Sequence, residues 1–428
     1  MAPVAERQDL VATAFADLRS SAGGPASLVA LRDAAYGRFV DRGLPTTRDE
    51  EWRFTNLAPL AAFTFERARP VTVERDLVAG LVPGLTSAVW LVVANGRLAG
   101  VPASVPSGVS IRTLERARPE ELAPVRPAGG SVLVDLNTAL FEDLVIVEVP
   151  PHAVVTEPIV IASIVVPGAR PSVVAPRIVL TVGEGAQVSM VEVHGEVGSG
   201  DAVFVNAVVD VQVGPGAIVD HVKYQRQGPQ SFHLASMFVT TARAGTFTSQ
   251  AITLGGRIAR NDIVSVLDGE GAECTLNGLY VAGGDSLVDT HTTIDHARAH
   301  CPSHEVYRGI LTGRARAVFN GKIVVRQDAQ KTDAKQTNKA LLLTDEAQIN
   351  TKPQLEIFAD DVKCTHGAAI GQLDEDALFY LRARGVGAID ARNMLIHAFA
   401  EDVLAGVKAE PVRRAAMARV EEILGLPH

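Results

Sequence analysis

The sequence has 428 residues, enough for two or three domains, and 47% of them are hydrophobic whereas only 5% are aromatic. A core built from small branched side chains is typical of stacked strands. The net charge is −9, with acidic and basic residues interleaved, so the sequence shows no basic surface for nucleic acid and we expect no nucleic-acid partner.

Cysteine usage and the first residues indicate the compartment. Cys274, Cys301 and Cys364 form no CxxC pair and cannot make an even disulfide framework. The N-terminal segment MAPVAERQDL has early acidic residues and no apolar stretch, unlike a secretory signal. No run of about 18 apolar residues exists to span a membrane. We expect a soluble cytoplasmic protein without a membrane partner.

Residues 1–130 are expected to form an N-terminal helical and mixed domain. Leu10, Phe15 and Leu18 lie at helical spacing, and a second helical segment, ASLVALRDAAYGRFVDRG, ends at Gly43. Further on, VWLVVANGRL predicts a strand followed by an Asn-Gly turn, and ERARPEELAP predicts a short helical piece.

An aromatic pair lies in the segment EEWRFTNLAPL, after the second expected helix. Trp52 and Phe54 either cover the core or form a partner-binding surface. The sequence alone leaves both interpretations open.

Residues 131–373 are expected to form the β-rich core. Short β-branched runs such as LVIVEVP and PIVIASIVV are separated by Gly, Pro, Asn and Asp. A small-residue turn recurs at spacings of roughly 25–31 residues, with one gap about half as long again. The recurring segments are GEGAQVSM near 183, GPGAIVDH near 214, RAGTFTSQ near 243, GEGAECTL near 269, GRARAVFN near 313 and TDEAQINT near 344. The persistent turn favours a β-helix over a large β-sandwich, and the absence of long helical patterns disfavours a βαβ sheet.

Residues 374–428 are expected to form a C-terminal helical domain. Asp374 is a candidate N-cap of the first helix, and Gly425 ends the last one. The middle helix carries an apolar stripe of Met394, Leu395, Ala398, Phe399 and Val403. The helices either cap the end of the coil stack or present a docking face for another protein.

Patterns for nucleotide binding or hydrolysis are incomplete. In GRARAVFNGKIVV, Lys322 is followed by Ile323 and not by the Ser or Thr of a phosphate loop. The segment SHEVYRG has Arg308 where a zincin needs its second histidine, and no GxSxG is present.

Two groups of potential metal ligands remain. The first is DTHTTIDHARAHCPSHEVYRG, with His291, His296, His300, Cys301 and His304. In strands or loops these side chains would point in several directions. Surface or turn histidines are therefore favoured over a complete or shared metal site.

The second group is Cys364 with His366. Two residues apart on a strand, both side chains lie on one face, whereas Lys363 and Thr365 lie on the other. The pair is either half of a metal site or a buried cysteine beside a hydrogen-bonded histidine. The chain cannot supply four thiolates at one place, so any iron–sulfur cluster would be shared with a partner.

Several long segments resemble the SufB/SufD family of the Suf iron–sulfur cluster assembly machinery. They are EEWRFTNLAPL, HCPSHEVYRGIL, ARAVFNGKIVV, DAQKTDAKQTNKALLL, INTKPQLEIFADDVKCTHGAAIGQLDEDALFYLRARG and ARNMLIHAFAEDVL. The resemblance extends from about residue 45 to about residue 405 and is dense in the last third. It implies a mainly β fold: a right-handed parallel β-helix core flanked by N-terminal α/mixed and C-terminal α-helical parts.

The resemblance also implies a role and partners. The chain would be a non-catalytic scaffold subunit that pairs with a SufB paralogue through the end of the β-helix. Its C-terminal helices would dock a SufC ABC-type ATPase, and recipient apo-proteins would take the product. The cofactor implied is an iron–sulfur cluster or iron, held transiently and shared with the partner, with no nucleotide bound by this chain. A homodimer is possible when the chain is isolated.

The motif CxHG singles out His366 as an interface residue that works with a cysteine from SufB, with Cys364 as the second candidate. SufB-type chains carry a cysteine where Thr337 stands and a HEA motif where His366-Gly367-Ala368 stands, so this chain fits the SufD branch.

Further candidates and alternatives remain. His300, Cys301 and His304 are additional candidate ligands for metal. One alternative is a homodimeric β-helix interaction module without a metal role. Another is a β-helix carbohydrate-active enzyme, which needs a secretion signal and an acidic groove that the sequence does not show.

Overall fold

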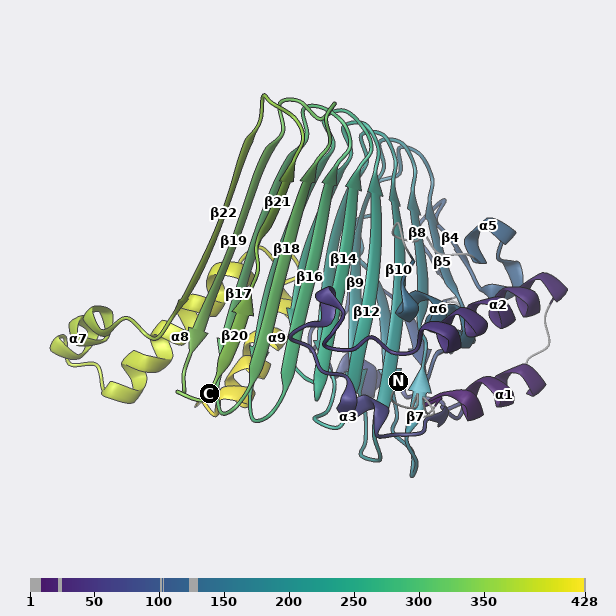
Figure 1. Cartoon of the computed structure of the whole chain (residues 1–428), viewed down its shortest axis with the longest axis horizontal. Helices are drawn as coiled ribbons and strands as arrows, with labels where there is room; N and C mark the ends of the chain where they lie inside the picture. The colour runs from purple at the N-terminus through teal and green to yellow at the C-terminus, as the bar shows by residue number, and fades with distance from the viewer. Residues whose placement is uncertain (1–8, 22–24, 101, 103, 123–129, 427–428) are drawn as a thin grey trace, which may run out of the picture.

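The computed structural model describes residues 9–21, 25–100, 102, 104–122 and 130–426. Two sheets face each other and form a parallel β-solenoid of about eight turns, so the predicted β-helix core is confirmed (Figure 1). The first eight residues lie outside the described residues, and they belong to the segment MAPVAERQDL, for which no secretory signal is expected. The last two residues of ERARPEELAP also lie outside the described residues.

The first sheet, sheet A, contains 12 strands that are parallel apart from the pairing of β4 with β5. They are β1 (Glu66–Arg67), β4 (Ser110–Arg112), β5 (Val145–Val149), β7 (Ser172–Val174), β8 (Arg177–Val182), β10 (Val203–Val213), β12 (Phe232–Thr241), β14 (Ile258–Leu267), β16 (Leu287–His296), β18 (Arg316–Val325), β20 (Gln348–Thr351) and β21 (Gln354–Ile357).

The second sheet, sheet B, contains 10 strands and is parallel apart from the pairing of β2 with β3. They are β2 (Val89–Ala94), β3 (Arg97–Leu98), β6 (Ile159–Val165), β9 (Gln187–Glu196), β11 (Ile218–Arg226), β13 (Thr246–Thr253), β15 (Glu273–Ala282), β17 (Pro302–Leu311), β19 (Asp333–Leu342) and β22 (Lys363–Gly371). From β8 to β19 the chain alternates between the two sheets, so each pair of strands makes one turn of the solenoid.

Alternate side chains of each strand face the lumen between the sheets, because successive residues of a strand point to opposite faces. In-register pairing stacks equivalent positions from turn to turn: Val188, Val219, Phe247 and Cys274 follow one another across β9, β11, β13 and β15. All four are at most 3% exposed. The columns are filled mostly by small aliphatic side chains, as the composition predicts.

The recurring small-residue turns are corners of the solenoid. Gly185, before β9, and Gly271, before β15, have φ of 61° and 71°, a region that disfavours a Cβ. Ala244 takes the equivalent position before β13 with φ of 53°. The segments near 183 to 269 lead from sheet A into sheet B, whereas those near 313 and 344 lead from sheet B into sheet A. The longer gap in the repeat is therefore a change from one corner series to the other.

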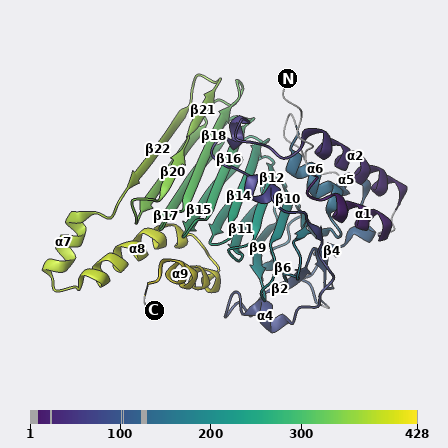
Figure 2. The same cartoon turned by 60° about the horizontal axis from the view of Figure 1, so that its bottom comes forward.

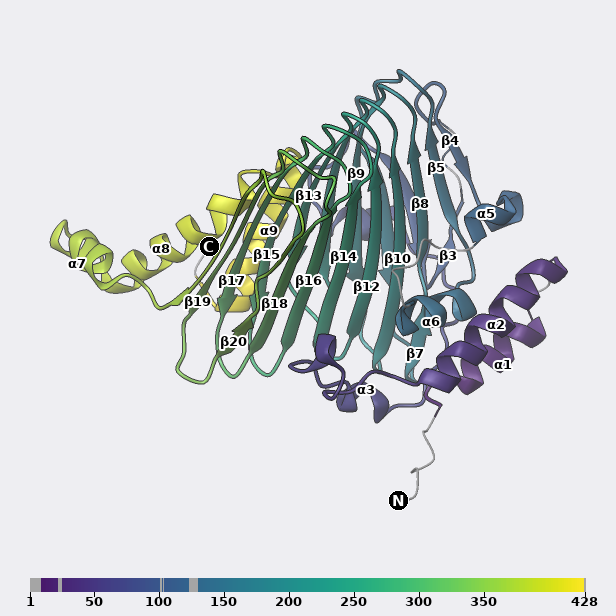
Figure 3. The ribbon, with the colours of Figure 1, turned by 45° about the horizontal axis from the view of Figure 1, so that its top comes forward.

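Most of the N-terminal helices cover the outer face of sheet A at one end of the stack (Figures 1 and 3), whereas the short helix Arg75–Ala79 packs on sheet B through Val78. Phe204, Phe232 and Ile258 of that face form one core cluster with apolar residues of the first helices, which confirms the helical prediction. The helices of this part are α1 (Ala12–Ser21), α2 (Ala26–Arg42), α3 (Ala58–Ala61), α4 (Arg75–Ala79), α5 (Pro119–Leu122) and α6 (Val132–Leu140), with short 3-10 turns at Glu50–Trp52 and Leu114–Arg116.

The predicted strand in VWLVVANGRL is also confirmed. β2 and β3 form a hairpin at Asn95 and Gly96, and β2 pairs in parallel with β6. Strands from the first 130 residues therefore extend the solenoid sheets. The division into units 1–130, 131–373 and 374–428 stays a prediction.

The C-terminal helices are α7 (Glu375–Ala383), α8 (Ala388–Leu404) and α9 (Glu410–Leu424). α8 and α9 lie along the outer face of sheet B, so of the two alternatives the capping of the coil stack is wrong for these helices (Figure 2). The buried stripe of α8 runs through Ile396, Ala400 and Val403, whereas Met394 is 52% exposed. Among the helices of the described ranges, none is long and apolar enough to cross a membrane.

Candidate functional site

β22 is the last strand of sheet B and lies at the end of the solenoid opposite α1 and α2 (Figure 1). Within the described part of the chain it pairs with β19 only, so its other edge offers unpaired backbone N–H and C=O groups. Every residue of β22 except Cys364 is exposed, including Ile370. Ile357 and Phe358 at the end of β21 add exposed apolar surface. An unpaired edge with apolar neighbours is a template for another chain.

Cys364 and His366 lie on the lumen side of β22, because their register partners Ala334 and Gln336 are buried in the lumen. Cys364 is half-buried against an apolar cluster that includes Ala334. Burial raises the pKa of the Cys364 thiol. His366 is exposed at this end of the solenoid, the open end, which is formed by β22. The two predicted ligands therefore share one face of one strand.

Thr337 and Gly367 are register partners on β19 and β22. Both alternate with the lumen positions, so they lie on the outer face of sheet B, away from the side of Cys364 and His366. A Cβ at Gly367 would have no neighbour within 4 Å among the described residues.

The five potential ligands between residues 291 and 304 do not come together. His296 faces the lumen, where its Nε2 lies 2.9 Å from Ser303 Oγ, and burial lowers its pKa to about 4. His300 is a corner residue with φ of 60°. Cys301 is buried and its Sγ donates to Gly269 O at 3.3 Å, whereas His304 is exposed on the outer face of sheet B.

The donor set at the open end is incomplete. Cys364 offers a soft thiolate and His366 a borderline imidazole, and both suit iron. Two ligands are too few to hold an iron–sulfur cluster. Across the described ranges, no group of three or more His, Cys, Asp and Glu side chains is arranged to hold a metal ion. A cluster at this place would need further ligands from another molecule.

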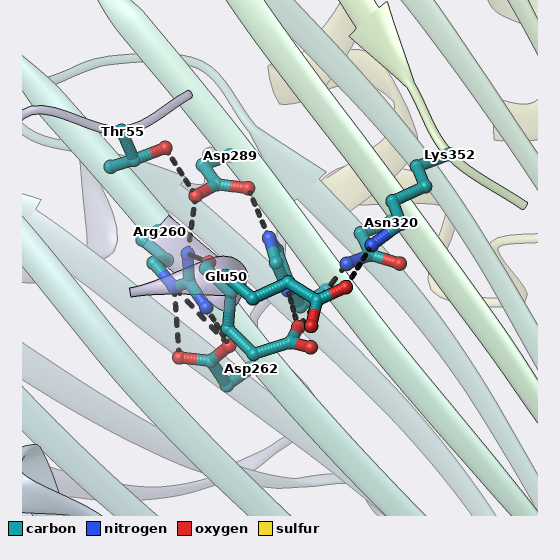
Figure 4. A network of polar contacts seen from close by, with 9 residues as sticks. Glu50, Thr55, Arg260, Asp262, Asp289, Asn320 and Lys352 are labelled. Atoms are coloured by element: carbon teal, nitrogen blue, oxygen red, sulfur yellow. Dashed lines mark hydrogen bonds and ion pairs between the residues drawn. The ribbon is translucent and has the colours of Figure 1, made fainter. Parts of the chain in front are cut away.

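His291 belongs to a polar network on the outer face of sheet A, of which Figure 4 labels Asp289 and Arg260. Its Nε2 lies 3.1 Å from Asp289 Oδ1 and its Nδ1 lies 3.2 Å from Glu51 Oε2. Burial lowers the pKa of His291, but Asp289 and Glu51 outweigh this effect and raise it to about 9. Sequence reasoning missed this contact, which joins residues 240 positions apart.

The segment EEWRFTNL crosses sheet A as a strap that this network holds in place. Arg260 donates to Asp289 at 2.6 Å and to the carbonyl of Glu51 at 2.8 Å, and its guanidinium lies 3.7 Å from the centre of the Trp52 ring. Lys352 pairs with Glu50 at 2.7 Å. The aromatic pair is thus divided: Trp52 packs on the solenoid, whereas Phe54 is 43% exposed.

A second polar cluster that sequence reasoning missed lies inside the solenoid. Glu192 accepts from His221 at 2.8 Å and from His194 at 3.0 Å, and His221 also bonds Ser249. All these groups are nearly inaccessible to solvent. Burial raises the pKa of Glu192, but the two histidines outweigh it and hold that pKa well below its usual range. The only sequence signal is the period-two spacing of Glu192 and His194.

Two family profiles match most of this chain. A family profile described as "SUF system FeS cluster assembly, SufBD core domain" matches residues 165–399, and one described as "SufBD protein N-terminal region" matches residues 18–161. This chain belongs to the SufB/SufD family. The core match includes β22 with Cys364 and His366, and the N-terminal match includes the strap.

Two of three relatives of this SufB/SufD chain carry matching descriptions. An iron–sulfur cluster assembly SufBD family protein of Synechocystis is 33% identical over 88% of this chain and 87% of its own length. The iron–sulfur cluster assembly protein SufD of Escherichia coli is 31% identical over 90% of this chain and 91% of its own length. The chloroplastic protein ABCI7 of Arabidopsis thaliana is 28% identical over 95% of this chain and 88% of its own length. The chain is thus an iron–sulfur cluster assembly SufBD family protein.

Proposed function

We propose that this chain is the SufD-type scaffold subunit of a Suf assembly complex and that it does not itself catalyse a reaction. It pairs with a SufB-type paralogue through the open end of the solenoid. Iron and sulfur are the cargo of the complex, and the nascent cluster is held transiently between the two chains before transfer to recipient apo-proteins. The chain itself binds no nucleotide.

One observation carries the proposal: the unpaired edge of β22 presents Cys364 and His366 on one face as two donors of an incomplete set. Pairing this edge with the edge of a paralogue satisfies the backbone groups and brings the partner's ligands to the same place. His366 offers an imidazole nitrogen to iron, or orients a sulfur group on a cysteine of the partner. Cys364 is the second donor.

Docking of a SufC-type ATPase is assigned to the C-terminal helices. α7 has no buried residue and extends away from the solenoid, and Phe379, Tyr380 and Ile389 are 73%, 56% and 71% exposed (Figure 2). Large apolar side chains at such exposure are typical of a binding surface. Nucleotide-driven movement of the ATPase is transmitted through these helices to the open end.

The proposed location is the cytoplasm, where reducing conditions keep the free thiol of Cys364 available. In isolation, the same edge of β22 accepts a second copy of this chain, so we expect a homodimer when the paralogue is absent.

Co-purification tests this function. The tagged full-length chain is co-expressed with the SufB-type and SufC-type subunits of the same organism, and both are expected to elute with it in one complex. The charged variant Ile370→Glu on β22 should release the paralogue while retaining the ATPase. Recovery of neither subunit with the unmodified chain would overturn the assignment.

A further inference from the structure

A column of polar side chains runs through the lumen and ends at His366. Glu305 on β17 is the register partner of Gln336 on β19, and Gln336 is the register partner of His366 on β22. Glu305 is 1% exposed and Gln336 is 2% exposed. Register partners on neighbouring parallel strands lie about 4.8 Å apart, with side chains on the same face. Gln336 is therefore the residue directly beneath His366.

The orientation of the Gln336 amide is fixed by its buried neighbour. Its Nε2 donates to Glu305 Oε2 at 2.7 Å. When Glu305 is ionised it can only accept, and the reversed amide would place oxygen against a carboxylate oxygen, so in this state the amide donor faces Glu305. The Oε1 atom is buried and has no hydrogen-bond partner among the described residues. A buried amide oxygen without a partner is unfavourable and is rare in folded proteins.

This acceptor suits a histidine that binds metal. A ligating imidazole offers one ring nitrogen to the metal and generally donates the N–H of the other to a carbonyl or carboxylate, which fixes its tautomer and orientation. His366 has no hydrogen bond of this kind within the described part of the isolated chain, where it is exposed. Association at the β22 edge would bury it over Gln336.

We propose that Gln336, oriented by Glu305, is a positioning residue for His366: in the assembled interface its Oε1 accepts one imidazole N–H and leaves the other ring nitrogen free for iron. This proposal rests on the proposed function, because it requires His366 to act at the shared site. It assigns the buried pair a role that neither family membership nor the exposed ligands reveal.

The test measures binding of Fe(II), added without oxygen, to the purified complex of this chain with its paralogue and ATPase. Gln336→Met keeps the length of the side chain and removes the acceptor, so the affinity for Fe(II) should fall about 10-fold or more. The matched control is Asn338→Leu. Asn338 is also a lumen amide of β19, bonded to Tyr280 and Thr351, but its register partner on β22 is Ala368.

A rescue variant separates positioning from packing. In the double variant Glu305→Gln with Gln336→Glu, donor and acceptor exchange places, and the carboxylate at 336 still offers an oxygen to His366. Fe(II) affinity should return to within about threefold of the unmodified complex, since the acceptor that tunes the ligand is restored. The proposal is overturned if Gln336→Met and Asn338→Leu lose Fe(II) affinity equally. It is also overturned if the double variant does not restore Fe(II) affinity.

A parallel measurement with His366→Ala separates this proposal from the proposed function. If His366→Ala lowers Fe(II) affinity and Gln336→Met does not, the role of Gln336 is wrong and that of His366 stands. If His366→Ala itself has no effect, the proposed function of the open end is overturned, and the role of Gln336 with it.

Discussion

Thr55 and Asp289 lie 234 positions apart in the sequence, yet the Thr55 hydroxyl donates to Asp289 Oδ2 at 2.5 Å. Both residues are at most 1% exposed. Asp289 also accepts from Arg260, so one buried carboxylate joins the N-terminal strap to two strands of sheet A. This contact fixes how the N-terminal segment lies on the solenoid.

Asp289→Asn should destabilise the fold strongly. The substitution removes one of the two carboxylates that balance the buried Arg260, the other being Asp262. Weakening the charged hydrogen bonds from Arg260 and Thr55 should cost about 2 kcal/mol or more. Urea unfolding followed by circular dichroism measures the loss. The control is Asp285→Asn, which breaks an ion pair with Arg314 whose members are 72% and 65% exposed. The control should lose less than about 1 kcal/mol. Equal losses in the two variants would show that Asp289 is not a structural anchor.

Gly278→Ala should also destabilise the solenoid. Gly278 is the register partner of Tyr307, and a Cβ at this glycine would lie 2.2 Å from the Tyr307 ring. Because Tyr307 is 1% exposed, its ring has little room to move, and overpacking should cost about 1–3 kcal/mol. Gly367→Ala on β22 is the control, because no atom of the described residues would lie within 4 Å of the new Cβ. The melting temperature of this variant should equal that of the unmodified chain. An unchanged melting temperature for Gly278→Ala would contradict the tight lumen packing.

The lumen carboxylate Glu305 should make stability depend on pH. Burial raises its pKa from 4.5 to about 7 in the folded chain. Because the pKa of Glu305 is higher in the folded chain than in the unfolded chain, protonation of Glu305 stabilises the fold. This contribution is fully present below pH 4.5 and is lost as the pH rises through 7. Glu305→Gln stays neutral, so from pH 5 to pH 8 its stability should improve relative to the unmodified chain by about 2 kcal/mol.

Chemical unfolding at several pH values measures this difference. The exposed Glu273→Gln at the start of β15 is the control and should follow the unmodified chain. A constant difference between Glu305→Gln and the unmodified chain across the range would show that Glu305 does not titrate in this window.

One of the three thiols should react quickly in the folded chain. Cys274 and Cys301 are 1% and 0% exposed, whereas Cys364 is half-buried at the open end. Because burial raises the pKa of the Cys364 thiol, its labelling by a disulfide reagent should accelerate as the pH rises into the alkaline range. Cys364→Ser should abolish the fast phase, and bound paralogue should protect it. A fast phase that survives Cys364→Ser would place the reactive thiol elsewhere.

The local pattern of the chain predicts the solenoid because each turn repeats the same physical requirements. β-branched runs predict the strands, and small residues such as Gly185 mark corners that need a positive φ. The same reasoning places Cys364 and His366 on one face, since strand alternation is local. Asp374 was likewise expected as an N-cap, and its Oδ1 accepts from Asp376 N at 2.9 Å.

Contacts between distant segments escaped prediction. The histidines from His291 to His304 are close in sequence but lie in different places. His291 lies on the outer face of sheet A, and His296 of the same strand faces the lumen. His300 is a corner residue, and His304 lies on the outer face of sheet B. The pairing of Gln336 with His366 depends on strand register, which no single segment specifies. The contact of Glu51 with His291 depends on how the strap lies across sheet A. The buried stripe of α8 was misjudged because sheet B, and not the end of the stack, decides which face is covered.

Cluster formation in the complex tests the role of His366 most directly. The complex of this chain with its SufB-type and SufC-type partners is reconstituted with iron and sulfide, and the cluster yield is read from visible absorbance. His366→Ala should leave the complex assembled but lower the yield several-fold, whereas His304→Ala, an exposed histidine on the outer face of the same sheet, should leave it unchanged. An unchanged yield with His366→Ala in an intact complex would contradict the account.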